Sequence, residues 1–485
     1  MMKEIYSFQN KKINNYKLKR NNGITLISLT VTIIILLILS GITITTLKSK
    51  NGVITNAQKA KSETAYNSAK DEAKLEVSNL TLYGQSNSLD TKKLALEASR
   101  DLGTANNNKT GWSEVKYSEN TIYVKNVNSS IKKDNSGLQN GEAIFKFEIN
   151  GDIVVFNGEI ASNSDEYKNA TPAFAVNENI KLGDNVYYES KSHKNETTIS
   201  KDYYGNNEAE ETLTTGSKNE YYNKDQVLQY SKFKNTSWKV WNINKEDGTI
   251  ELISKEPIWQ EIELIGSNGY NNGPKILNDV CSDFYSDTSR NIIARSVDLK
   301  DIEVCYNTSV ENVAKSNNTK YGNEITTKGI YNLNYLPIVY GTDENIIITD
   351  KQKNDLRANL NDEYISSKKD NDEIATKTNR NSITLKNTSY ILTKSDYNKF
   401  INESERIDMI TKPSWLASRY IKVNDDNTVS YCLYGLYSNG LNNYGMTGTT
   451  GYSNGYTSYL RPIVTLDSSV KITKGLLSWK VNDNS

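Results

Sequence analysis

Few residues in this 485-residue chain have the chemistry of a catalytic or metal site. Its one histidine, His193, lies in the polar stretch 191–195. A metal site built on several histidines is therefore excluded, and neither a Ser-His-Asp nor a Cys-His pair is expected. We interpret His193 as a solvated loop residue. The sequence predicts no catalytic residue, no metal site and no cofactor, and hence a protein that is not an enzyme.

The three cysteines are Cys281, Cys305 and Cys432. Because their number is odd, they can form one disulfide at most, and the spacing of Cys281 and Cys305 permits that pair without establishing it. Cys281 falls on the apolar face of a helix predicted to begin at Pro274. This position favours a buried structural thiol over a reactive one.

Tyrosines near the C-terminal end are the best candidates for binding. The chain has 32 tyrosines and 8 phenylalanines. A tyrosine offers a flat apolar face and a hydroxyl group, which suits stacking on a sugar or contact with a protein. The alternative is that tyrosine fills half-buried strand positions, which its β-propensity favours. We predict an exposed, glycine-rich binding loop that is dispensable for folding and contains Tyr437, Tyr444, Tyr452 and Tyr456.

Charge and composition restrict the classes of partner. The 58 basic and 58 acidic residues give a formal net charge of +0, and hydrophobic residues make up only 36% of the chain. No basic footprint for a nucleic acid is present, so none is expected as a partner. The length suits two or three domains with long polar surface segments. The polar insertions at 307–329 and 361–387 receive no role from the sequence.

The most pronounced feature is the apolar run 24–47, which contains no charged residue and follows a basic leader at 1–23. About 20 apolar residues suffice for a helix to cross a bilayer. The sequence therefore predicts a transmembrane helix over 24–47. Positively charged flanks stay in the cytoplasm, so the N-terminus is expected there. The helix would then be a single-pass anchor in the cell membrane, with the C-terminal domains outside the cell.

The junction Gly23-Ile24-Thr25-Leu26-Ile27 resembles the prepilin-type leader of type IV pilins and pseudopilins. The resemblance implies a prepilin peptidase that cuts after Gly23, methylation of the new amino group of Ile24, and other pilin subunits as partners. Ser28 stands where assembling pilins carry a glutamate, which points to a minor or non-polymerising subunit. An uncleaved anchor is the alternative interpretation.

Residues 48–160 are predicted to form an amphipathic helix and a pilin-like β head. Helical spacing resumes after Asn51-Gly52, a predicted break, and Asp90 is a suitable cap for a second short helix. Asn150-Gly151 between alternating hydrophobic residues predicts a hairpin, because both residues accept positive φ. Residues 161–235 are assigned to a polar linker and strand region.

Residues 236–485 form the predicted C-terminal domain. Trp415-Leu416-Ala417-Ser418-Arg419, the later glycine-tyrosine segment and Arg461-Pro462 occur in this order. The pattern is similar to C-type-lectin-like domains, which include formylglycine-generating enzymes. Those enzymes use a close pair of cysteines near the C-terminal end, whereas only Cys432 is present here, so the resemblance does not imply their oxidase activity. Trp415 is predicted to be a core residue.

The predicted fold class is α+β. It consists of a long N-terminal helix (membrane span, then amphipathic part), a small antiparallel-sheet pilin-like head and a C-type-lectin-like C-terminal domain. The predicted function is a membrane-anchored, surface-displayed pilin-like protein, such as a minor pilin or adhesin, that binds a glycan or a surface protein. The alternative is a surface-anchored enzyme with a formylglycine-generating-enzyme-like fold but no recognisable catalytic residues.

Overall fold

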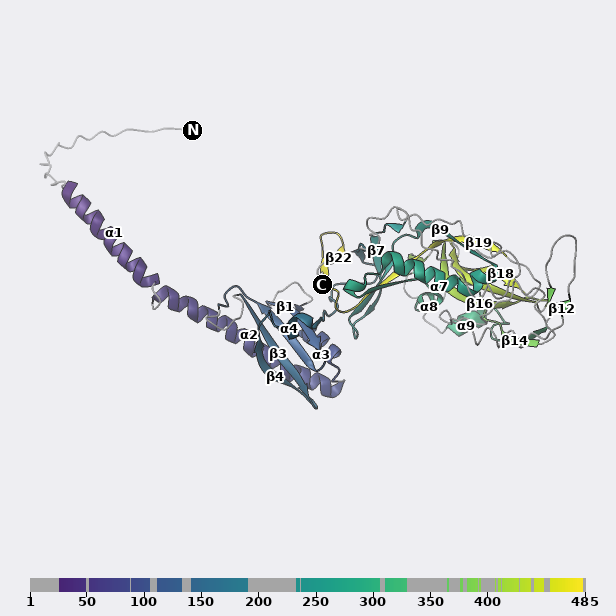
Figure 1. The fold of residues 1–485 in the computed structure, drawn as a ribbon, viewed down its shortest axis with the longest axis horizontal. Coiled ribbons are helices and arrows are strands. Elements are labelled where there is room, and N and C mark those ends of the chain that lie inside the picture. The colour runs from purple at the N-terminus through teal and green to yellow at the C-terminus, as the bar shows by residue number, and fades with distance from the viewer. Residues whose placement is uncertain are drawn as a thin grey trace, which may run out of the picture.

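Two units follow one another along the computed structural model (Figure 1). The structure describes residues 26–48, 52–87, 89–104, 111–132, 141–190, 233–235, 237–305, 310–328, 364–365, 376–377, 382–390, 392–393, 406, 409–410, 412–426, 428–437, 440–448 and 454–482. We call α1 to α4 with β1 to β5 the N-terminal unit, and the elements from β6 onward the C-terminal unit.

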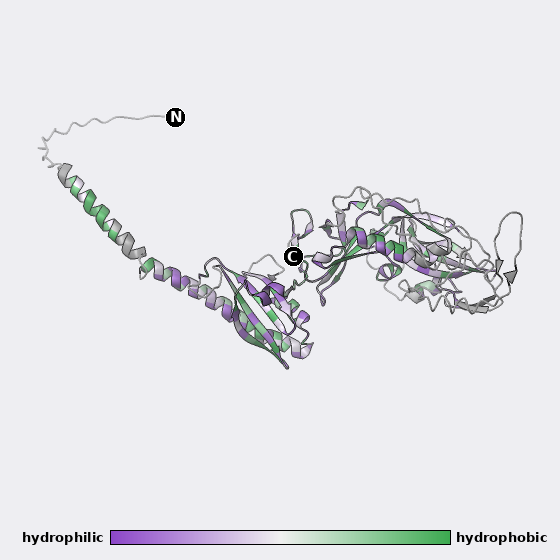
Figure 2. Cartoon of the chain, viewed as in Figure 1, coloured by the Kyte–Doolittle hydropathy of each residue, from purple (hydrophilic) through white to green (hydrophobic). Residues whose placement is uncertain are grey.

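The N-terminal unit begins with two separate helices, α1 (Leu26–Lys48) and α2 (Val53–Ser86). Gly52 between them is extended (φ −74°, ψ 155°), so the helical hydrogen bonding does not continue from one helix into the next. The buried face of α2 includes the small residues Ala69, Ala73 and Gly84. Small side chains let the helix approach the sheet closely. Figure 2 shows hydrophobic residues gathered along α1 and hydrophilic residues over much of α2.

The helix α3 (Thr91–Asp101) begins as predicted, since the Asp90 side chain accepts a 2.9 Å hydrogen bond from the backbone N–H of Lys93. Such a cap satisfies one of the free N–H groups at a helix start. The predicted hairpin is also confirmed, because Asn150 pairs with Ile153 around Gly151, whose φ is 60°. Both features arise from local backbone chemistry.

An antiparallel sheet of five strands completes the core of the N-terminal unit. The strand order is β4-β3-β2-β1-β5, and the short helix α4 (Asp165–Asn169) precedes β5. The strands are β1 (Trp112–Ser118), β2 (Thr121–Val127), β3 (Glu142–Asn150), β4 (Ile153–Ile160) and β5 (Thr171–Pro172).

The central sheet of the C-terminal unit has seven strands in the order β10-β20-β8-β7-β6-β22-β21. They are β6 (Asn185–Tyr187), β7 (Ser237–Asn244), β8 (Thr249–Ser254), β10 (Ile292–Ser296), β20 (Pro462–Leu466), β21 (Ile472–Lys474) and β22 (Trp479–Val481). The first of these, β6, comes from the segment assigned to the polar linker and strand region. It pairs with β22 in parallel and with β7 in antiparallel orientation.

Further sheets pack around this one. A four-stranded sheet has the order β15-β18-β17-β16, and β19 pairs with β9 in a two-stranded ribbon. The strands are β9 (Ile258–Ile265), β15 (Leu392–Thr393), β16 (Ser414–Val423), β17 (Val429–Tyr437), β18 (Gly440–Gly448) and β19 (Gly455–Leu460). Two short pairs join β11 (Glu324–Lys328) to β14 (Ser382–Lys386) and β12 (Tyr364–Ile365) to β13 (Thr376–Lys377).

The described helices of the C-terminal unit are α7 (Gly266–Tyr285), α8 (Leu299–Glu303) and α9 (Val310–Asn317), with a 3₁₀ turn at Thr288–Arg290. Hydrophobic cores lie on both faces of the seven-stranded sheet. Along β8, Leu252 belongs to the core that contains α7, whereas Ile253 belongs to the core beneath the four-stranded sheet. This alternation follows from the period of two in a strand.

The two units touch through α3 and through the segment that follows β5. The backbone N–H of Phe174 donates a 2.8 Å hydrogen bond to the carbonyl of Ser468, and Lys92 Nζ lies 3.1 Å from Asp467 Oδ2. Gly248 packs against Leu96 of α3. The segment after β20 therefore meets the helix formed more than 350 residues earlier.

The predicted fold class is wrong. β-Sheet dominates the regular structure of the described residues, and helices are few. In place of one long N-terminal helix, α1 ends at Lys48 and α2 begins at Val53, because Gly52 is extended. No helix in the described part of the chain has the combined length and apolar character that crossing a membrane requires.

Candidate functional site

A pair of aromatic rings, one exposed and one half-buried, lies on the ribbon of β9 and β19, which Figure 1 shows beside β18 and α7. Along β9, Ile258, Ile262 and Leu264 are buried and belong to the core. The intervening positions face outward and include Trp259, whose exposed fraction is 58%. The other five tryptophans of the chain are all buried, so Trp259 differs from them in facing solvent.

A β-bulge sets the direction of Trp259. Tyr459 pairs with Glu261, but the next residue of β19, Leu460, pairs with Ile258, so the register shifts between them. Bulges re-aim side chains and occur frequently beside functional sites. The Trp259 and Tyr459 rings meet edge to face, with centroids 4.9 Å apart and planes at 70°. We call these two rings the aromatic pair.

Buried side chains from the C-terminal motifs hold β9 in place. Trp415 is fully buried, and its indole Nε1–H donates a 2.8 Å hydrogen bond to the carbonyl of Ile262. The guanidinium of Arg461 is also fully buried, and Nη2 donates to the carbonyl of Ser254 at 3.2 Å, just before β9 begins. Trp415 thus holds the strand that carries Trp259, whereas Arg461 holds the end of β8, and neither side chain meets solvent.

The Arg461 side chain is held in an unfavourable environment. Burial lowers the pKa of Arg461 to about 10, and the charge of Glu256 partly offsets this effect. Its Nε and Nη1 have no hydrogen-bond partner in the described part of the chain. Glu256 in turn pairs with Lys412, which pins the segment between β8 and β9 from outside.

The predicted tyrosine loop is only partly a surface feature. Tyr444 has an exposed fraction of 6%, and its ring centroid lies 4.5 Å from that of Trp415. Burial, and then contact with Tyr437, raise the pKa of Tyr444. The prediction that Tyr444 sits in an exposed loop is wrong, because β18 pairs along its length with β17 and turns this side chain into the core.

The other predicted tyrosines differ from one another. Tyr456 is half-buried with its ring 5.1 Å from Tyr444, and it packs against the core. Tyr437, at the end of β17, has an exposed fraction of 37%. Tyr452 lies outside the described residues, as do Gly23 and Ile24 of the predicted leader junction. Among the predicted loop tyrosines that the structure describes, Tyr437 is therefore the one whose ring is substantially exposed.

The cysteines are structural. Cys281, Cys305 and Cys432 are all buried and free, so the possible pair of Cys281 with Cys305 does not form. Burial raises the pKa of Cys432 to about 12 and raises that of Cys281 well above its usual value. Protonated, enclosed thiols are poor nucleophiles.

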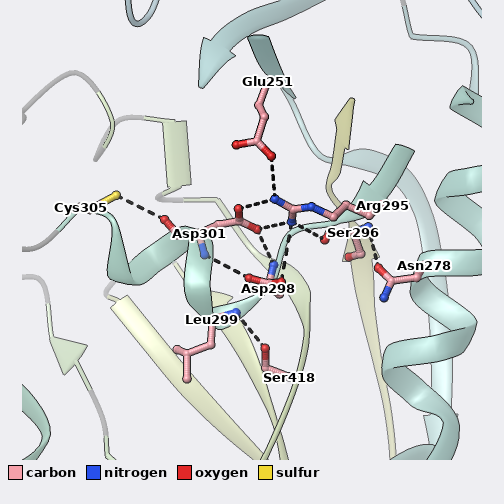
Figure 3. A network of polar contacts seen from close by, with 9 residues as sticks. All are labelled: Glu251, Asn278, Arg295, Ser296, Asp298, Leu299, Asp301, Cys305 and Ser418. Carbon is pink, nitrogen blue, oxygen red and sulfur yellow. Dashed lines mark hydrogen bonds and ion pairs between the residues drawn. The ribbon is translucent and has the colours of Figure 1, made fainter. Parts of the chain in front are cut away.

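A polar network of charged residues lies beside the seven-stranded sheet (Figure 3). Arg295 donates to both carboxylate oxygens of Asp301, at 2.6 and 2.7 Å, and to Glu251 at 3.1 Å. Burial lowers the pKa of Arg295, but the hydrogen bonds and charge of Asp301, together with the charges of Asp298 and Glu251, raise this pKa overall. Asp301 also caps α8 with Asp298.

This network ties elements together and offers no reactive group. It joins β8, β10 and α8, while the Ser418 hydroxyl of β16 accepts a 2.8 Å bond from the N–H of Leu299. The carboxylates of Asp298 and Asp301 each pair with Arg295 and each accept a hydrogen bond from a backbone N–H group. Among the residues that the structure describes, no group of three or more potential metal ligands occurs.

Sequence reasoning missed Trp259, although the signal was present. In the stretch Ile258 to Ile265, Trp259 shares its parity with Glu261 and Glu263, whereas Ile262 and Leu264 have the opposite parity. In a strand the glutamates should face water, and so should a tryptophan on the same side.

Comparisons with protein-family models, with curated proteins and with solved structures find no match for this chain.

Proposed function

We propose that this protein is a surface-displayed, pilin-like binding protein, attached to the cell membrane through its apolar N-terminal segment. Its C-terminal unit would bind a glycan or a surface protein through the aromatic pair. The exposure of Trp259 on a bulge carries the binding part of the proposal. The leader junction at Gly23 and the apolar run 24–47 support attachment and processing by a prepilin peptidase.

The surface of α1 also supports attachment. Its described apolar side chains point away from the rest of the chain, as Leu36 and Leu37 illustrate with exposed fractions of 59% and 65%. Apolar area left in water costs about 25 cal/mol per Å². A row of such side chains therefore favours cover by lipid or by other helices.

Binding is tested with the full-length protein held in detergent or nanodiscs. The wild type is applied to a glycan array and to an array of extracellular matrix proteins. We expect Trp259→Ala to remove the binding that the wild type shows, and Ile293→Ala, which changes another exposed apolar side chain, to leave it intact. Equal binding by Trp259→Ala and wild type would overturn the proposal.

Attachment and processing need their own measurement. Mass spectrometry of membrane-extracted protein should find a chain that begins at methylated Ile24. Replacing Gly23 by a bulky residue should block the cut and leave the protein in the membrane fraction. An intact leader on the wild-type protein would refute the processing, and recovery in the soluble fraction would refute the attachment.

A further inference from the structure

The hairpin of β21 and β22 carries two leucines at its tip. The N–H of Gly475 donates a 2.9 Å hydrogen bond to the carbonyl of Ser478, which closes the turn, and Leu476 and Leu477 lie between them. Their exposed fractions of 99% and 90% are the highest among the large hydrophobic side chains that the structure describes. Figure 1 shows this hairpin at the end of the C-terminal unit that meets the N-terminal unit. We call these two residues the leucine tip.

The fold does not require leucine at this tip. Short hairpin turns favour glycine, asparagine and aspartate, whose backbone preferences suit the turn, and leucine has no such preference. A single exposed leucine is an ordinary surface feature. Here two adjacent leucines are almost completely in water, where apolar area is unfavourable. The leucine tip would therefore gain stability from an apolar phase that covers it.

The same hairpin is basic. The segment 470–482 contains Lys471, Lys474 and Lys480 and no acidic residue. In the described part of the chain none of these lysines forms an ion pair, and Lys474 Nζ lies 5.9 Å from the ring centroid of Trp479 instead. Lys474 and Lys480 are exposed. Apolar side chains surrounded by positive charges are complementary to a lipid surface with acyl chains beneath anionic headgroups.

We propose that the leucine tip inserts into the surface of an anionic lipid bilayer, with the three lysines at the level of the headgroups. This contact is separate from the apolar run 24–47 and goes beyond the proposed function, which assigns no role to the hairpin.

The base of the hairpin holds the leucine tip in place. The indole of Trp479 has an exposed fraction of 4%, and its Nε1–H donates a 2.9 Å hydrogen bond to Asp184 Oδ2. The strand β22 also pairs in parallel with β6. Because the base is fixed before the lipid arrives, insertion costs little conformational entropy.

The test uses full-length protein reconstituted in vesicles, with an environment-sensitive fluorophore on Ser478→Cys. The three native cysteines are buried, so the label is confined to the introduced thiol. The vesicles contain phosphatidylcholine alone or with phosphatidylglycerol, and some lipids carry a quenching spin label on the acyl chain. We expect strong quenching in the anionic vesicles and little in the zwitterionic ones. A label on Glu246→Cys, an exposed position between β7 and β8, should not be quenched in either.

Two double variants separate the apolar and the charged contributions. Leu476→Ser with Leu477→Ser should lower the quenched fraction about tenfold and leave the melting temperature unchanged. Lys474→Gln with Lys480→Gln should lower it by a similar factor in the anionic vesicles only, and high salt should have the same effect. The matched control, Lys245→Gln with Lys255→Gln, removes two exposed charges elsewhere and should behave like wild type.

Three outcomes would overturn the inference: no quenching in anionic vesicles, undiminished quenching in the leucine variant, or equal quenching by both kinds of vesicle. Failure of the proposed attachment gives a different result, because the protein would then not remain with the vesicles in which it was reconstituted. The same spin-labelled vesicles added to the soluble protein would still quench the label on Ser478→Cys if the leucine tip inserts.

Discussion

The indole N–H of Trp415 on β16 donates a 2.8 Å hydrogen bond to the carbonyl of Ile262 on β9. No ladder of hydrogen bonds joins these two strands among the described residues, so a side chain connects the four-stranded sheet to the ribbon. Removing that side chain should therefore damage both the core and the position of Trp259.

Trp415→Ala is expected to reduce the free energy of unfolding by about 3–5 kcal/mol, because it leaves a large cavity and an unpaired buried carbonyl. Thermal unfolding of the full-length protein, followed by circular dichroism, measures the effect. Trp259→Ala, which changes an exposed tryptophan, should stay within about 0.5 kcal/mol of wild type. A similar loss of stability in both variants would contradict this assignment of core and surface.

Tyr444 and Tyr437 should respond differently to the same change. Tyr444→Ser removes a buried ring packed on Trp415 and should cost about 3 kcal/mol, whereas Tyr437→Ser should cost well under 1 kcal/mol. Comparing the two melting temperatures checks the difference. Should Tyr444→Ser melt like wild type, its burial in the native state would be wrong.

The raised pKa of Glu76 on α2 predicts that the protein loses stability as the pH rises. Burial, followed by repulsion from Asp101, raises the pKa of Glu76 to about 8, with Glu97 adding to the shift and Asn79 opposing it. The unfolded value is 4.5, so the unfolded chain releases this proton first. The contribution of Glu76 to the free energy of unfolding is complete below pH 4.5 and is lost as the pH rises from 4.5 to about 8.

The variant Glu76→Gln isolates this contribution. It keeps the shape of the side chain but cannot ionise, so its stability relative to wild type should increase between pH 5 and pH 8.5. Chemical denaturation at several pH values measures the difference. A constant difference across this range would show that Glu76 titrates normally in the folded protein.

Asp301→Ala should lower the free energy of unfolding because Asp301 makes two separate stabilising interactions. It pairs with Arg295 through both oxygens, and it completes the cap of α8. Breaking such an enclosed pair leaves a partly buried guanidinium without its main partner, and the expected loss is about 3 kcal/mol. Glu251→Gln, which weakens a single 3.1 Å contact, should cost about 1 kcal/mol or less. Equal costs, measured by urea unfolding, would refute the ranking.

Gly248 controls the contact between the units. Its φ is +70°, and a Cβ atom there would lie 2.8 Å from side-chain atoms of both Leu96 and Ser468. Gly248→Ala should therefore loosen α3 from the C-terminal unit at a cost of about 1–3 kcal/mol. Limited proteolysis should detect faster cleavage between the units. An unchanged cleavage pattern would mean that the contact adapts without cost.

Local signals in the sequence were sufficient for some elements. Asp90 and Asn150-Gly151 marked a helix start and a hairpin because their side chains and backbone preferences act within a few residues. Nothing local marked the pairing of Val186 with Trp479, which are almost 300 residues apart. Tyr444 looked like a loop residue because its neighbours are glycine and asparagine. Only its pairing partner on β17, Leu433, places it beside the core.

The parallel pairing of β6 with β22 has a consequence for synthesis. β6 takes its place between β7 and β22, so the seven-stranded sheet stays open until residues 479–481 have left the ribosome. Until then β6 presents an uncovered edge, which is a template for pairing with the wrong chain. The C-terminal unit thus gains its parallel strand pair only after residues 479–481 have been made, and a message truncated just before Trp479 would leave β6 as an exposed edge strand.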